Sequence, residues 1–377
     1  MTKWVTKKLG EVCDILDNRR KPMNDEQREI GEYPYCGANG IVDYINIYEF
    51  DEPTILIAED GGNFSDYEKK PIAYKMEGKY FVNNHAHVLK AKNDYIQDFI
   101  FYHIVHQDVN PVITGGTRSK LTRGELENIP IRIPALPDGT PDLAEQRRIA
   151  GILSSADGAI AASEALIEKY RNIKRGLLTT LLQPKDGWKK VKLGEVGHIS
   201  MCKRIFSFET TEEGDIPFYK IGTFGKVADA YITKEKYEEY KTKFSFPKKG
   251  DILLSASGTI GRTVIYDGEP AYFQDSNIIW LAHNETIVLN EFLYYLYKIT
   301  SWNLEGSTIA RLYNDNFNKI EISVPYKNGQ PDLTEQRRIA EILSSVDAKI
   351  ASEEKVVEKY KGVKKGLMEE MMGSKKN

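Results

Sequence analysis

The sequence predicts an α+β protein made of two pseudo-symmetric α+β modules separated by a two-helix antiparallel coiled coil. Three observations support this prediction: an internal repeat, a long uninterrupted helical segment in each copy, and short β-type runs between these segments. We expect the first module at residues 1–140, the first long helix at 141–183, the second module at 184–330 and the second long helix at 331–377.

The composition of the 377-residue chain narrows its class. Hydrophobic residues make up 41% and charged residues 28%, and the net charge of −3 argues against a protein that coats nucleic acid by bulk positive charge. Cys13, Cys36 and Cys202 form neither a disulfide framework nor a paired metal spacing, so we expect a reducing cytoplasm. We find no signal-peptide pattern and no stretch near the ~20 apolar residues of a membrane span.

The internal repeat consists of two blocks. Leu-Gly-Glu-Val at Leu9–Val12 returns at Leu193–Val196. Pro141–Leu182 returns as Pro331–Met372, with 23 identities in 42 aligned positions. The residues between the blocks share only a skeleton. A duplicated chain with divergent middle parts suits a two-part molecule with a pseudo-two-fold axis.

The longer block predicts a helix of about forty residues in each copy. Asp142 and Glu145 have the N-cap to N3 spacing of a capping box, and the second copy repeats it. Apolar residues then recur at alternating spacings of four and three, as in a coiled-coil seam, over Leu153–Leu181 and Leu343–Met371. The seam is interrupted at Ser163, Lys174, Glu353 and Lys364. A two-fold axis across the helices makes them antiparallel partners; the alternative is that each packs only on its own module.

Each module begins with the Leu-Gly-Glu-Val block and continues in short β-type runs broken by Gly, Pro and Asp. The clearest runs are Thr54–Ala58, Tyr80–Leu89, Asp251–Ser255 and Tyr272–Leu281. A helix is expected after them, at Tyr95–Val109 in the first module and Asn290–Trp302 in the second.

Polar groups at matching places in the two modules suggest contact with DNA. Basic, hydroxyl and loop residues that suit a phosphate clamp are Arg19, Arg20, Lys21, Thr117, Arg118, Lys120, Arg123, Lys203, Arg204, Thr308, Arg311 and Tyr313. Amides that suit base edges are Asn83, Asn84, Gln274 and Asn277. The alternative for each of these is an ordinary surface residue.

Catalytic motifs are missing from the sequence. There is no [DNS]-P-P-[YFW] loop of an adenine methyltransferase, and Gly258–Gly261 lacks the lysine of a P-loop. His85, His87, His103 and His106 could bind a metal, but ordinary histidines explain them more simply. We therefore expect a binding protein with no catalytic residue, metal or cofactor of its own.

The chain resembles the specificity (S) subunit of type I restriction–modification systems over nearly its whole length. The resemblance rests on the doubled Leu-Gly-Glu-Val, the doubled Glu-Gln-Arg-Arg-Ile-Ala (Glu145–Ala150 and Glu335–Ala340), and Lys-x-Gly-Leu near each helix end (Lys174–Leu177 and Lys364–Leu367). It implies that each module is a target recognition domain for one half of a bipartite, asymmetric site in double-stranded DNA. The paired helices would then be the spacer.

The resemblance also implies partners. Methyltransferase subunits, two copies expected, would dock on the constant regions and supply S-adenosylmethionine, and a motor and endonuclease subunit would join for cleavage. Docking candidates on the charged helix surface are Arg147, Arg148, Arg337 and Arg338; the alternative is a solvated face. Two other functions remain open: a coiled-coil scaffold that presents two protein- or glycan-binding modules, and an unrecognised enzyme.

Overall fold

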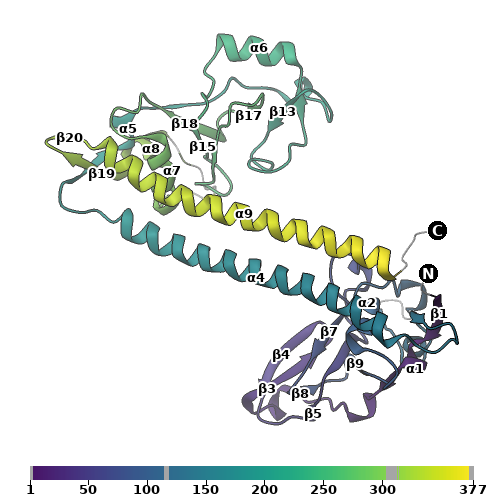
Figure 1. Cartoon of the computed structure of the whole chain (residues 1–377). Helices are drawn as coiled ribbons and strands as arrows, with labels where there is room; N and C mark the ends of the chain where they lie inside the picture. The colour runs from purple at the N-terminus through teal and green to yellow at the C-terminus, as the bar shows by residue number, and fades with distance from the viewer. Residues whose placement is uncertain (1–2, 114–118, 303–311, 313, 373–377) are drawn as a thin grey trace. The chain divides into compact units, whose positions relative to one another are not determined.

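The computed structural model describes residues 3–113, 119–302, 312 and 314–372. The chain divides into two units, Met1–Ala165 with Glu354–Asn377, and Leu166–Glu353. The first unit holds one α+β module with the start of helix α4 (Leu143–Leu181) and the end of helix α9 (Leu333–Met372). The second holds the other module with the end of α4 and the start of α9 (Figure 1).

The first module contains three sheets. A two-stranded sheet joins β1 (Lys3–Lys8) to β10 (Pro130–Ala135). One four-stranded sheet has the order β2 (Cys13–Ile15), β9 (Ala86–Ala91), β6 (Thr54–Ala58), β7 (Ala73–Met76). The other has the order β4 (Gly40–Ile45), β3 (Ile30–Gly37), β8 (Lys79–Val82), β5 (Phe50–Asp51), in which β3 and β8 are parallel. The helices are α1 (Leu9–Val12), α2 (Gln97–Ile104) and α3 (Arg123–Glu127), with 3₁₀ turns at Asp17–Arg19, Asp25–Gln27, Phe64–Asp66 and Asn110–Val112.

The second module repeats most of this topology, with an added strand, β20, in its first sheet and, among the described residues, no counterpart of β5. Its sheets are β11 (Trp188–Lys192), β19 (Glu321–Lys327), β20 (Gln330–Pro331); β12 (His198–Ser200), β18 (Ile278–Ala282), β15 (Ile252–Ser255), β16 (Thr263–Ile265); and β14 (Tyr231–Ile232), β13 (Ile216–Tyr219), β17 (Tyr272–Phe273). Strands β13 and β17 are parallel, as β3 and β8 are. Helices α5 (Leu193–Val196), α7 (Asn290–Ile299) and α8 (Asn314–Lys319) match α1, α2 and α3, and a 3₁₀ turn lies at Ser207–Glu209, whereas α6 (Lys234–Lys243) has no counterpart among the described helices of the first module. The predicted pair of pseudo-symmetric α+β modules is confirmed.

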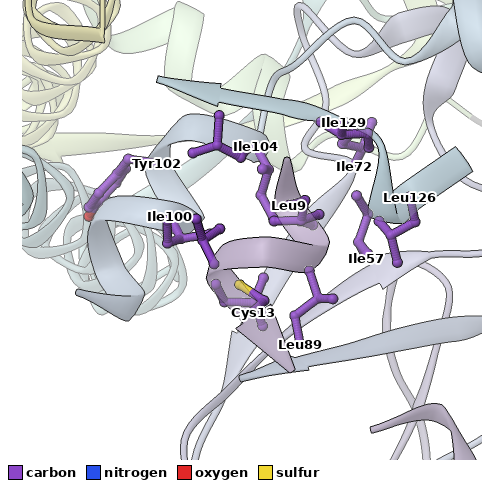
Figure 2. Packing of buried hydrophobic residues seen from close by; sticks show 14 of the residues in the cluster. Leu9, Cys13, Ile57, Ile72, Leu89, Ile100, Tyr102, Ile104, Leu126 and Ile129 are labelled. Atoms are coloured by element: carbon purple, nitrogen blue, oxygen red, sulfur yellow. The ribbon is translucent and has the colours of Figure 1, made fainter. Parts of the chain in front are cut away.

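The repeated Leu-Gly-Glu-Val forms the short helix α1 at the centre of the module core. Leu9 and Val12 are fully buried, and Figure 2 shows Leu9 among side chains from α2, α3 and the sheet. Gly10 lets α1 approach α3, because a Cβ there would lie 3.1 Å from Cβ of Glu127. The Glu11 carboxylate accepts the backbone N–H of Lys8 at 2.6 Å. All four positions of the motif therefore have a packing or capping reason, and α5 repeats them in the second module.

The start of each long helix is tied to the module beside it. The Asp142 carboxylate accepts the backbone N–H of Glu145 at 3.0 Å, as an N-cap should. The Glu145 side chain turns to Arg148 instead of returning to the cap, so the predicted capping box is only half formed. Gln146 is fully buried and accepts the backbone N–H of Ile96, at the start of α2. Gln336 accepts that of Leu289, at the start of α7.

Within each unit the two long helices run antiparallel. In the first unit, Lys364 of α9 binds Asp157 of α4 and Lys361 binds Glu164. Residue numbers therefore increase along α4 in the direction in which they decrease along α9. In the second unit, Lys174 binds Asp347, and Lys349 lies 5.5 Å from the ring centroid of Tyr170. Leu367 and Met368 of α9 pack on the core of the first module, and Leu177, Leu178 and Leu181 of α4 pack on the core of the second. Among the seam positions whose burial is described, Tyr360 departs from the pattern, since it is exposed.

Some predicted elements are shorter or divided. The run at Tyr80–Leu89 forms two strands, β8 and β9, because the Asn83 side chain accepts the backbone N–H of His85 and turns the chain. The run at Tyr272–Leu281 is likewise split into β17 and β18. Helix α2 ends at Ile104 and α7 at Ile299, earlier than the sequence predicts.

Candidate nucleic-acid interface

Three segments meet at the same place in each module. They are the loop after β2 or β12, the loop after β6 or β15, and the connection from β8 to β9 or from β17 to β18. In the first module Arg20 joins them, because its guanidinium donates to Glu59 at 2.6 Å and to the carbonyl oxygen of Ala86 at 2.9 Å. In the second, Arg204 donates to Asp275 at 2.8 Å and Ser257 donates to Asn277 at 2.8 Å. We name each meeting point a three-loop surface.

A network of charged groups underlies the first three-loop surface. His87 is buried, and its ring nitrogens lie 2.6 Å from an Asp17 carboxylate oxygen and 2.8 Å from the carbonyl oxygen of Leu121. Arg20 also reaches Asp17, at 3.2 Å, and Lys120 lies 2.9 Å from Glu59. The network links segments far apart in the sequence and holds the loops in place.

The neighbouring cations keep the two carboxylates of this network ionised. Burial raises the pKa of Asp17, but the hydrogen bond and charge of His87, together with Arg20, outweigh burial and hold that pKa below its usual value. Burial also raises the pKa of Glu59, but hydrogen bonds from Lys120 and Arg20 outweigh burial and hold that pKa below its usual value. Both carboxylates are therefore ionised and balanced by cations at neutral pH.

Asp17, Glu59 and His87 also satisfy the spacing of a metal site, since their ligand atoms lie within 4.8 Å of one another. The cluster already contains the cations of Arg20 and Lys120. The residues therefore fit an internal ion network better than a metal centre. The four histidines considered as a metal set have separate partners: His103 accepts from the backbone of Arg132, and His106 lies 2.6 Å from the carbonyl oxygen of Tyr67.

Two hollows open on the first three-loop surface. One has a volume of about 320 Å³ and is lined by the β3–β4 hairpin, Asp60, Asn83 and His85. The other has a volume of about 720 Å³ and is lined by Met23, Arg28, Tyr35, Asn83, Asn84 and His85 among others. Asn83 and His85 border both hollows.

The basic candidates of the first module differ in their exposure and in their ion-pair partners within the module. Arg19 is held by Glu52 at 2.5 Å, by Glu49, and by the face of Phe50. Arg20 is 13% exposed and belongs to the network. Lys21, Lys120 and Arg123 are about half exposed or more, and each pairs with a carboxylate at the surface. The last three are therefore best placed to exchange a weak surface ion pair for a phosphate.

The amide candidates of this module have different environments. Asn83 is buried and its oxygen holds the turn, whereas Asn84 is exposed. Only Asn84 of the two presents its amide to solvent.

The second module shows a similar division. Lys203 is exposed beside the Phe244 ring, and the Arg204 side chain is 58% exposed. Gln274 accepts the backbone N–H of Ile221, and Asn277 accepts from Ser257, so each amide oxygen is already used within the module. Five predicted contacts lie outside the described residues: Thr117, Arg118, Thr308, Arg311 and Tyr313.

The four docking candidates lie exposed in the second turn of each long helix. Arg148 binds Glu145 and Arg338 binds Glu335, in both cases through two short hydrogen bonds. Arg337 lies 3.5 Å from Glu291, and Arg147 is exposed.

Sequence reasoning missed a contact that occurs once in each unit, which we name the lysine–aspartate–tyrosine junction. In the first unit Asp157 of α4 accepts from Lys364 of α9 and, at 2.8 Å, from the Tyr102 hydroxyl of α2. In the second unit Asp347, Lys174 and Tyr295 repeat it. The signal was present, because Lys174 and Lys364 interrupt the apolar seam at equivalent places of the repeat. Lys174 and Lys364 are thus the partners of an aspartate that occurs in both copies of the repeat.

Helix α4 departs from the expectation that no stretch of the chain approaches a membrane span. Among the described helices it is the one long and apolar enough to cross a membrane by length and composition, since its most apolar 18 residues have a mean hydropathy of 1.2 and only 17% of them are buried. Such a single helix is weak support for a membrane span. Its Asp157 is used in the junction and its Leu153 is fully buried in the module core, so this part of the helix already has a packing role.

Comparisons with known proteins agree on one family. A family model described as the type I restriction modification DNA specificity domain matches twice, at residues 1–170 and 185–359. A putative type I restriction enzyme specificity subunit of Haemophilus influenzae is 44% identical over 350 residues, covering 90% of this chain and 87% of that protein. A type I restriction enzyme specificity subunit of Methanocaldococcus jannaschii is 26% identical over 414 residues, covering 99% and 92%.

Solved structures show the same fold. The S subunit of a type I restriction–modification system from M. genitalium aligns with a TM-score of 0.70 at 16% identity, covering 100% of this chain and 97% of that one. A chain from a structural study of complex assembly and conformational transition in a type I system aligns with a TM-score of 0.52 at 17% identity, covering 99% and 98%.

Proposed function

Because this chain belongs to the type I restriction–modification DNA specificity family, as a DNA-recognition subunit and not a catalytic one, we propose that each module reads one half of a bipartite site in double-stranded DNA. The scaffold alternative loses its support, since the family matches cover both modules. The observation that carries the proposal is the three-loop surface, which occurs at the same place in both modules with different residues. Equal scaffolds with unequal loops suit two different half-sites.

The proposed contacts divide by chemistry. Lys21, Lys120, Arg123, Lys203 and Arg204 are exposed cations at or near the three-loop surfaces and would hold phosphates. Asn84 is an exposed amide in the first module and would face base edges. Arg19 and Arg20 would act indirectly, because their guanidinium groups already hold the loops in place.

The long helices would act as the spacer and as the dock for other subunits. The junction fixes each module to the helix pair of its own unit, which suits a fixed distance between half-sites. Two methyltransferase subunits with S-adenosylmethionine would bind the constant helices, with Arg147, Arg148, Arg337 and Arg338 in the contact, and a motor and endonuclease subunit would join them. This assembly would work in the cytoplasm, where the three free cysteines remain reduced.

The test is a module exchange in cells that express the chain with its methyltransferase partner. Replacement of residues 1–140 by the corresponding module of another family member should change one half of the methylated sequence and leave the other half and the spacer unchanged. Sequencing of modified positions across the genome measures the outcome. A change in both halves, or in neither, would refute the modular reading.

A further inference from the structure

His85 stands between the two hollows of the first module. Its side chain is 39% exposed and borders both, and the exposed Ile41 and Val42 of the β3–β4 hairpin line the smaller hollow beside it. A half-exposed imidazole in a concave, partly apolar surface is placed to touch a ligand and not to fill the core.

One hydrogen bond orients this imidazole, and a second holds the backbone that carries it. Nδ1 lies 2.7 Å from a carboxylate oxygen of Asp60, and the backbone N–H of His85 donates to Asn83 at 2.8 Å. A carboxylate only accepts, so Nδ1 carries the proton, and the imidazole tautomer with its proton on Nδ1 has a lone pair on Nε2. Nε2 has no hydrogen-bond partner among the described residues. The pair thus presents one fixed acceptor to the hollows.

We propose, on the basis of the DNA-reading function above, that His85 reads an adenine of an A·T pair in the half-site of the first module. In the major groove, adenine offers its N6 amino group as a donor, which matches the lone pair on Nε2. The paired thymine offers a methyl group, which matches the exposed Ile41 and Val42 that line the same hollow. Asp60 is a positioning residue that selects the tautomer.

The neighbouring charges suit this role. Arg20 donates to the carbonyl oxygen of Asn84 at 3.4 Å and so holds the reading loop, and Lys120, half exposed beside Glu59 on the adjoining segment, is a cation that can attract the DNA backbone. A carboxylate next to a DNA surface is unfavourable unless it is used, and Asp60 is used to orient His85.

The experiment compares the methylated sequence produced by the complete complex with His85→Ala, Asp60→Asn and the matched control His198→Ala, an exposed histidine of the second module. His85→Ala should raise methylation of sites altered at one A·T position of one half-site roughly 10-fold relative to the intact site, the loss of about one good base contact. Asp60→Asn should relax the same position less, because an amide can present either its oxygen or its nitrogen to Nδ1. His198→Ala should leave that half-site unchanged.

Several outcomes would overturn the assignment. One is an unchanged sequence preference in His85→Ala, with the variant folded as judged by its thermal transition. Others are relaxation at a G·C pair and relaxation in both half-sites. Failure of the proposed function would differ from these, because the wild-type complex itself would then show no bipartite methylated site.

Discussion

Reversing one charge of the lysine–aspartate–tyrosine junction should loosen the helix pair of the first unit. Asp157→Lys removes the acceptor of the buried Tyr102 hydroxyl and places two lysines together, because Lys364 is the other partner. A hydrogen bond to a charged group contributes about 2 kcal/mol, and a partly exposed ion pair adds at most about 1 kcal/mol. We expect a total loss of about 3 kcal/mol, which is roughly 100-fold in the local opening equilibrium.

Hydrogen exchange of backbone amides measures this effect where it arises. Amides at the start of α4 and the end of α9 should lose protection in Asp157→Lys and, less strongly, in Lys364→Asp. The double reversal should recover about 1 kcal/mol, because the opposite charges meet again while the tyrosine contact stays altered. Lys365→Asp, on the exposed neighbouring residue, is the control and should change protection little.

Additivity would refute this reasoning. If the double reversal loses as much protection as the two single changes together, the side chains do not meet and the antiparallel register is wrong. Charge reversal at Asp347 and Lys174 in the second unit should likewise be partly recovered in the double variant. The two junctions therefore test the register independently.

Three further predictions concern the modules and the repeat. Arg20→Ala should cost about 3 kcal/mol in urea unfolding of the first module, because it removes the guanidinium that the largely buried carboxylates of Asp17 and Glu59 share, whereas Lys21→Ala should change stability by less than about 0.5 kcal/mol. Burial lowers the pKa of His103 from 6.5 to about 4, so the unfolded chain binds this proton at a higher pH than the folded chain does. The free energy of unfolding should therefore fall by at most about 3 kcal/mol as the pH drops from 6.5 to 4. His103→Asn should remove this share of the pH dependence of the unfolding midpoint. A chain of residues 1–183 carries Tyr102, Asp157 and Lys174, so two copies can form the junction twice, and sedimentation should detect a dimer that Lys174→Asp weakens; a monomer at all concentrations would contradict the equivalence of the two junctions.

The architecture was predictable because its signals are local or repeated. The duplicated block, the N-cap at Asp142 and the spacing of apolar residues each act within a few residues and identify the long helices. The repeat then supplies the partner of each helix. The long helices and their pairing could therefore be predicted from the order of residue types along the chain alone.

The candidate site was less predictable because its contacts join distant segments. Arg20 binds Glu59, 39 residues away, and His87 binds Asp17, 70 residues away. A sequence pattern cannot show that an arginine in a basic run is neutralised by a carboxylate on a distant segment. The basic run at 19–21 therefore suggested three phosphate contacts, whereas only Lys21 is largely exposed.

The contacts between constant and variable parts explain how such a chain can change its loops without losing its scaffold. Gln146 and Gln336 bind backbone N–H groups, of Ile96 in one module and Leu289 in the other, so the contact survives a change of side chain there. The junction adds a single tyrosine from each module. Since the described contacts of these constant residues do not reach the three-loop surfaces, the loop residues are free to diverge, and new DNA sequences can be read from an unchanged frame.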